Sequence, residues 1–136
     1  MTSGDRNEST VLQSHDNTAE IDQSGDDNLS TVNQSGLAAF GGNHAAIEQS
    51  GDFNRSIVDQ NFGSNTADVL QTGLGTALDP NTVSIAQFGG GNSAYAEQNG
   101  GEGNSIIIEQ GSDGSPNSAL AFQDGSFNTT VIDQQP

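Results

Sequence analysis

Apolar and polar residues alternate along this chain in short units that recur from one end to the other. Each unit opens with Asn, closes with Gln six residues later, and has an aliphatic residue four positions after the Asn. The eleven aliphatic residues are Val11, Ile21, Val32, Ile47, Val58, Val69, Ile85, Ala96, Ile108, Ala121 and Ile132. Because side chains alternate across a β-strand, positions 0, +2, +4 and +6 of a unit share one face. The pattern predicts eleven seven-residue strands.

Charge is confined to the other face of these strands. The 44 residues at positions 0, +2, +4 and +6 include no Asp, Glu, Lys or Arg, whereas the 33 residues at +1, +3 and +5 include ten. The even positions therefore form the predicted inward face, and the odd positions face solvent.

The Asn and Gln residues of the repeat are the candidate structural residues. They account for 11 of the 14 Asn and 11 of the 12 Gln in the chain. Stacked in equivalent strands, they are expected to form amide ladders that satisfy polar groups which would otherwise be costly to bury. The pairs are Asn7 and Gln13, Asn17 and Gln23, Asn28 and Gln34, Asn43 and Gln49, Asn54 and Gln60, Asn65 and Gln71, Asn81 and Gln87, Asn92 and Gln98, Asn104 and Gln110, Asn117 and Gln123, and Asn128 and Gln134.

A second period distinguishes even-numbered from odd-numbered units. At position +2 every even unit has Ala, whereas the odd units have Ser, Val, Ile or Thr. Two kinds of strand therefore alternate, which predicts an all-β, two-strand-per-coil β-solenoid of about five and a half coils. With coils roughly 4.8 Å apart, the rod would be about 26 Å long.

The connections agree with this arrangement. Gly follows two residues after Gln in seven units, where tight arcs between strands need a positive φ. Two connections, residues 35–42 and 72–80, are longer and are expected to bulge from the rod. We divide the chain into a short N-terminal segment (1–6), the solenoid (7–134) and a tail (135–136), without a domain boundary.

Composition alone leaves two classes open. Only 30% of the 136 residues are hydrophobic and the formal net charge is −16, which suits either a disordered chain or repetitive cross-β structure. The strict order of the repeat favours the second. Arg6 and Arg55 are the only basic residues apart from two His, so no basic patch for nucleic acid or anionic lipid exists. The chain has no Cys and no apolar run near the ~20 residues that span a bilayer.

The segment Gln87-Phe88-Gly89-Gly90-Gly91-Asn92-Ser93-Ala94-Tyr95-Ala96-Glu97-Gln98 resembles the curlin repeat, Ser-x5-Gln-x-Gly-x-Gly-Asn-x-Ala-x3-Gln, except that Asn81 stands at the opening Ser. The resemblance implies a secreted subunit of curli-like functional amyloid, polymerising with itself at the cell surface as biofilm matrix and adhesive fibre. It also implies a nucleator subunit and an outer-membrane secretion pore as partners. Residues 1–6 lack a hydrophobic signal core, so any export signal is expected to have been removed.

The type of subunit is inferred from the last unit. The minor, nucleating subunit of curli fibres commonly ends in a basic, less regular repeat, whereas residues 128–134 are regular and acidic. The major-subunit type is therefore favoured, with a nucleating subunit as the alternative. A monomeric β-solenoid, acting as an adhesin or ice-binding module, is a further alternative that would need end caps.

No residue constellation predicts catalysis, a cofactor or a metal. His15 and His44 have no Ser, Cys or second His at a useful spacing. Acidic turns could attract Ca²⁺, but the glycine-rich calcium repeat of other β-helices is absent and solvated charge is the favoured interpretation. The turn residues concerned are Asp26, Asp27, Asp52, Asp113 and Asp124. The run Gly89-Gly90-Gly91 lacks the Lys-Ser/Thr of a phosphate loop and is expected to be a turn.

Outward apolar residues are concentrated in the later units. A stripe for pairing protofilaments and incidental β-propensity explain them equally well. They are Ile57, Tyr95, Ile107, Leu120, Phe122 and Val131. The outward Thr residues do not form an unbroken rank, which disfavours ice binding; they are Thr18, Thr66, Thr82 and Thr129.

Overall fold

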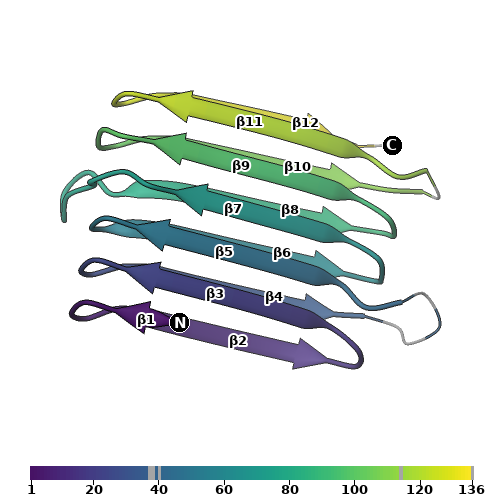
Figure 1. Cartoon of the computed structure of the whole chain (residues 1–136). Helices are drawn as coiled ribbons and strands as arrows, with labels where there is room; N and C mark the ends of the chain where they lie inside the picture. The colour runs from purple at the N-terminus through teal and green to yellow at the C-terminus, as the bar shows by residue number, and fades with distance from the viewer. Residues whose placement is uncertain (37–38, 40, 114, 136) are drawn as a thin grey trace.

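The computed structural model describes residues 1–36, 39, 41–113 and 115–135. These residues form an all-β rod (Figure 1). Its strands are β1 (Thr2–Ser3), β2 (Glu8–Ser14), β3 (Thr18–Ser24), β4 (Leu29–Ser35), β5 (His44–Ser50), β6 (Asn54–Asn61), β7 (Thr66–Gln71), β8 (Asn81–Phe88), β9 (Ser93–Asn99), β10 (Ser105–Gly111), β11 (Ser118–Asp124) and β12 (Thr129–Gln134).

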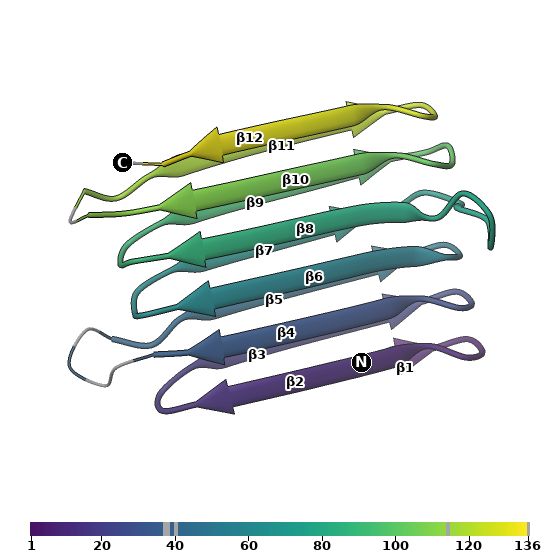
Figure 2. The same ribbon diagram turned by 180° about the vertical axis from the view of Figure 1, so that it is seen from behind.

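The strands form two parallel sheets. Sheet A has the order β1-β3-β5-β7-β9-β11 and sheet B the order β2-β4-β6-β8-β10-β12. The chain passes from one sheet to the other after each strand, so two strands make one coil and the coils stack along the rod (Figures 1 and 2). Sheet A contains the even units and sheet B the odd units. The predicted two-strand-per-coil β-solenoid is confirmed.

Register is kept from coil to coil. Ala45 of β5 pairs with Ala19 of β3 and Ala67 of β7, and Gln49 pairs with Gln23 and Gln71 in the same way. Each repeat position thus becomes a straight column along the rod. In-register stacking follows from the repeat because identical spacing brings each inward side chain over its equivalent in the next coil.

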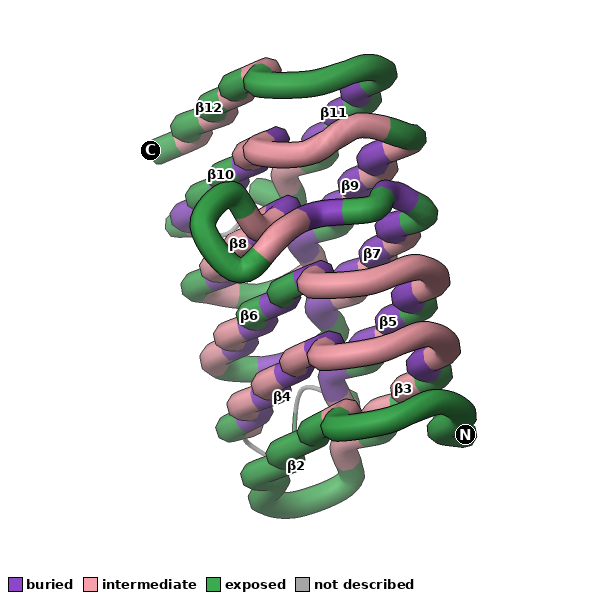
Figure 3. The backbone as a smooth tube through the Cα atoms, turned by 90° about the vertical axis from the view of Figure 1, so that its left-hand side faces the viewer, coloured by how far each residue is buried: buried purple, intermediate pink, exposed green. Residues whose placement is uncertain are grey.

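The core is the narrow space between the two sheets. Residues at +2 and +4 of the inner coils are buried, whereas their sequence neighbours are more exposed, so that buried and more exposed segments alternate along these strands (Figure 3). Sheet A contributes a column of Ala at +2, and sheet B contributes Ser30, Ser56, Val83 and Ile106 at the same position. Position +2 is therefore uniformly small in sheet A and varies from Ser to Ile in sheet B.

Most of the arcs that connect sheet A to sheet B contain left-handed backbone. Gly25 has φ of 97°, and a Cβ there would lie 2.1 Å from the carbonyl oxygen of Gly51 in the next arc. Neighbouring arcs can stack at the strand spacing only because this position has no side chain.

The structure describes all of one long connection and part of the other. The later part of residues 72–80 projects from the rod between β7 and β8 (Figure 3). Leu78 in this part is 91% exposed. This agrees with the expected surface insertion. In the other connection, residues 37, 38 and 40 lie outside the described residues, as does Pro136 of the predicted tail.

The structure contains one strand that the repeat pattern does not predict. β1 lies in the segment 1–6 and pairs with the end of β3, with Thr2 opposite Gln23 and Ser3 opposite Ser24. Thr2 therefore occupies the Gln position of a further sheet A strand before the first unit. The sequence signal is the recurrence of Ser-Gly-Asp-x-Asn at residues 3–7, 24–28 and 50–54.

Candidate functional site

The Gln side chains form two continuous hydrogen-bonded columns, one in each sheet. In sheet B, Nε2 of each Gln donates to Oε1 of the next Gln towards the C-terminus, at 2.6 to 2.9 Å; the column runs Gln13, Gln34, Gln60, Gln87, Gln110 and Gln134. In sheet A the distances are 2.8 to 3.0 Å, and the column runs Gln23, Gln49, Gln71, Gln98 and Gln123. Every bond of both columns points in the same direction along the rod.

The second N–H of Nε2 ties the two sheets together. Gln34 donates to the Thr18 carbonyl, Gln60 to that of His44 and Gln87 to that of Thr66. Each acceptor is the second residue of the preceding unit in the facing sheet, because facing strands run in opposite directions. These buried amides therefore satisfy both hydrogens, as burial requires.

The Asn columns are built in a different way. Oδ1 of each Asn mainly accepts the backbone N–H of the Asn in the next coil, as between Asn28 and Asn7 at 3.0 Å and between Asn43 and Asn17 at 2.8 Å. The Nδ2 group donates to carbonyls of the arcs, and Asn28 spans its own arc and the next one through Ser24 and Gly51. Bonds between Asn side chains occur at Asn81, Asn104 and Asn128. Asn therefore anchors each arc to its neighbour, whereas Gln fills the interior.

These interactions place the remaining Asn residues of the repeat. Backbone N–H groups of Asn54, Asn65, Asn92 and Asn117 donate to Oδ1 of the Asn one coil earlier. In both sheets, these hydrogen bonds join successive strands of the same sheet along the rod. The arcs that end at these Asn residues are thus held in register by side chain and backbone together.

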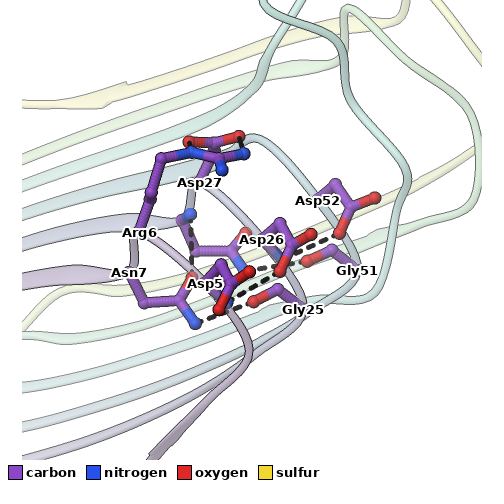
Figure 4. A network of polar contacts seen from close by, with 9 residues as sticks. Asp5, Arg6, Asn7, Gly25, Asp26, Asp27, Gly51 and Asp52 are labelled. Carbon is purple, nitrogen blue, oxygen red and sulfur yellow. Dashed lines mark hydrogen bonds and ion pairs between the residues drawn. The ribbon is translucent and has the colours of Figure 1, made fainter.

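Acidic residues of the first arcs act as hydrogen-bond acceptors between coils (Figure 4). Oδ1 of Asp26 accepts the backbone N–H of Asp5, and Oδ1 of Asp52 accepts that of Asp26, both at 2.8 Å. Next to them, Arg6 donates from Nε and Nη2 to the two carboxylate oxygens of Asp27. These bonds hold the pKa of the Asp27 carboxyl below its usual range and raise the pKa of Arg6.

The other sequence candidates lie at the surface. His15 and His44 are exposed. Residues 89–91 form the arc before β9, where the N–H of Gly91 donates to the Gly63 carbonyl. In the described part of the chain, no group of three or more His, Cys, Asp or Glu side chains is placed to hold a metal ion. Nor do these residues include a helix long and apolar enough to cross a membrane.

The outward apolar residues divide between the two faces. On sheet B, Ile57, Ile107 and Val131 belong to one +3 column, interrupted by Ser84. On sheet A, Tyr95 and Phe122 are in ring contact with centroids 5.6 Å apart, and Leu120 pairs with Tyr95 in register. The hydroxyl of Tyr95 donates to Glu97, which raises the pKa of the tyrosine.

The outward Thr residues are separated in the same columns. His44 lies between Thr18 and Thr66 in sheet A, and Ser105 lies between Thr82 and Thr129 in sheet B. A regular threonine rank is thus not formed in either sheet.

A family model for the curlin associated repeat matches residues 15–37, 42–73 and 79–111, which together make up more than half of the chain. The protein belongs to the curlin repeat family. The first match covers two strands, or one coil, and each of the other two covers three strands. The gaps between matches fall in the two long connections. No curated protein and no solved structure matches the chain significantly.

The curlin repeat explains which residues the fold requires. In this structure the Gln of the repeat forms the interior columns, and its Gly allows neighbouring arcs to pack closely. The Asn anchors each arc to the next, and the Ala is the small residue of the core. All four roles concern stacking of one coil on the next.

Proposed function

We propose that this curlin repeat protein is the structural, major-type subunit of secreted, extracellular curli-like amyloid fibres, and that it polymerises end to end. The observation that carries the proposal is that the two outermost strands of sheet B are exposed and that each has one free edge in the part of the chain that the structure describes. β2 and β12 are the outermost strands of sheet B, so each has one edge without a strand partner among the described residues. β2 is exposed at every residue and β12 is exposed or half-buried throughout (Figure 3). Exposed strand edges are templates for pairing with another chain.

The ends also carry the open ends of the Gln columns. Gln13 begins the sheet B column with an Oε1 that has no donor among the described residues, and Gln134 ends it with one Nε2 hydrogen free of a Gln acceptor. Addition of a further copy would continue the backbone pairing and the amide column by the interactions that already repeat within the chain. Biofilm matrix and adhesion are the roles that the family resemblance implies for such a fibre, with a nucleator subunit and a secretion pore as partners.

The purified chain should form unbranched fibres with a meridional cross-β spacing near ~4.7 Å in X-ray fibre diffraction. Electron microscopy over a day and sedimentation velocity at high concentration provide the test. A species that remains monomeric would contradict the proposal and favour a single-rod binding module. Immediate assembly together with acceleration of another subunit's assembly at trace amounts would instead favour a nucleating subunit.

A further inference from the structure

We infer the register of the joint between successive copies, an inference that rests on the proposed function. The N-terminal arc, residues 3–7, of one copy stacks on the C-terminal arc, residues 124–128, of the preceding copy. β2 then pairs with β12, and β1 pairs with the end of β11. Sheet B continues along a whole strand, whereas sheet A continues through the two residues of β1.

The two arcs have the same length and the same backbone conformation. Gly4 and Gly125 have φ of 99° and 92°, and Arg6 and Phe127 both have φ of 57°. Two internal arcs, residues 24–28 and 50–54, share this conformation and stack on each other, whereas the intervening arcs before Asn81 and Asn104 are longer. The joint therefore repeats a contact that already exists between coils.

Gly125 leaves room for such a contact. A Cβ on Gly4 would lie 2.0 Å from the Gly25 carbonyl oxygen of the next arc, and one on Gly101 would lie 2.0 Å from that of Gly125. At Gly125 the nearest atom within 4 Å is Nδ2 of Asn128, at 3.8 Å. The space that holds the next carbonyl in the other arcs is open there, and the carbonyl of Gly4 from a second copy would fill it.

Hydrogen-bond donors and acceptors are complementary between the two ends. Within the chain, Gln Nε2 donates towards the C-terminus, and the Asn backbone N–H donates to Oδ1 of the preceding coil. Across the joint, Gln134 would donate to Gln13, and the N–H of Asn7 would donate to Oδ1 of Asn128. Because both kinds of bond have a direction, head-to-tail contact pairs donors with acceptors, whereas contact between two like ends does not.

The joint also separates like charges. Inside the chain, Glu109 lies in register with Asp133, and Asp22 with Glu48, so carboxylates stack on carboxylates. In the inferred register Asp133 faces Leu12 and Glu8 faces Thr129. Phe127 is 64% exposed and falls one layer below Arg6, whose guanidinium can lie over the ring while it holds Asp27.

The competing register would place β2 on β11, so that a sheet B strand continues sheet A. Counted up to the Asn that opens the next unit, the connection before β11 (111–116) has six residues and the connection before β2 (3–6) has four. The turns would then differ in length at the joint, and β1 would have no strand of its own sheet below it. Matching of the arcs selects β12 as the partner of β2.

Engineered disulfides distinguish these registers, because the chain has no Cys. In-register neighbours roughly 4.8 Å apart lie within the Cα separation that a disulfide spans. Fibres of the double variant Thr10→Cys/Val131→Cys are oxidised with copper phenanthroline, dissolved in denaturant and analysed on a non-reducing gel. The two positions lie at opposite ends of the rod, so a covalent ladder beyond dimers reports links between copies.

The expected result is a ladder for Thr10→Cys/Val131→Cys and none for Thr10→Cys/Leu120→Cys, which probes the competing register. Each single variant should stop at dimers. Ser84→Cys/Ile107→Cys, an in-register pair within one chain, is the positive control for oxidation. If Thr10→Cys/Val131→Cys does not assemble, Leu12→Cys/Asp133→Cys reports the same joint.

Two results would overturn the inferred register: a ladder from Thr10→Cys/Leu120→Cys, or oxidation of the internal control without a ladder from either pair that spans β2 and β12. Both results require fibres of the unsubstituted chain. If that chain remains monomeric, the proposed function fails, and the two failures are thereby distinguished.

Discussion

Glutamine is the residue on which the interior of this rod depends. Gln60 is fully buried, accepts from Gln34, and donates to both Gln87 and the carbonyl of His44. A buried amide is costly unless its donors and acceptor are all bonded, and stacking in register satisfies them in every inner coil. At the residue scale, a polar side chain therefore serves as core material because its neighbours are copies of itself.

Replacing Gln60 with Leu should lower the free energy of unfolding by about 2–4 kcal/mol, since it removes the acceptor of Gln34, the donor to Oε1 of Gln87 and one donor to the His44 carbonyl. Gln13→Leu, at the exposed end of the same column, should cost less than about 1 kcal/mol because water replaces the lost bond. The guanidinium midpoints of the two soluble chains, measured before fibres form, provide the comparison. Equal midpoints would show that the column contributes nothing to stability.

Adjacent residues of one strand should tolerate charge very differently. Ala94 is 2% exposed in the core, and Ala94→Lys would bury an unpaired charge at a cost of several kcal/mol. Tyr95 points outward beside Asp68 in the neighbouring strand, so Tyr95→Lys should leave the rod intact. Fibre yield and thioflavin kinetics should show a large loss or delay for the first variant alone. Equal tolerance of both would refute the buried face.

At the scale of elements, the arcs set how closely coils approach. Strands pair at their regular spacing, but the arcs must come together over the same distance, which places backbone where a side chain would otherwise lie. Gly25 and Gly51 meet this requirement with positive φ and no Cβ. The Asn side chains and the carboxylates of Asp26 and Asp52 then bond each arc to the next. A coil is therefore held at its corner as well as along its strands.

Gly25→Ala should destabilise the soluble rod by about 1–3 kcal/mol, because the new Cβ meets a carbonyl oxygen at 2.1 Å and the backbone is left-handed. Gly90→Ala is the matched control, since its nearest atom is 3.3 Å away and its φ is not positive. Thermal unfolding followed by circular dichroism measures the effect. The melting temperature should fall for Gly25→Ala and stay unchanged for Gly90→Ala. A similar drop in both would mean that the close approach of the arcs is not the cause.

At the scale of the whole molecule, acidic charge opposes the stacking that the backbone favours. The net charge is −16, and carboxylates such as Glu109 and Asp133 lie over each other in register. Association of two such rods adds repulsion between copies. Fibre formation should therefore depend on pH and salt, whereas the path of the backbone should not.

The lag before fibre growth should shorten as pH falls from 7 to 5, and also on addition of salt, because protonation and screening both weaken repulsion. The pair of Arg6 and Asp27 should survive this change. The pKa of Asp27 is lowered, so its contribution is present above the ordinary carboxyl pKa and is lost only as pH falls through the lowered value. Thioflavin kinetics across pH and ionic strength measure the lag. A lag that lengthens under both treatments would contradict this explanation.

The sequence by itself determined the strands, their inward faces and the alternation of two sheets. These features follow from local periods of two and from the difference between Ala19 and Ser9 at one repeat position, which any single pair of units already displays. Membership in the curlin family follows from the same positions.

Tertiary structure alone decided how the side chains bond. The direction of the Gln columns, the acceptance of backbone N–H by Asn7 and Asp26, and the strand β1 all join residues about one coil apart, such as Gln34 and Gln60 with a separation of 26. A repeat specifies which residues stack, but both amide orientations fit the same spacing. Which atom donates is set only when the neighbouring coil and the facing sheet supply the remaining partners.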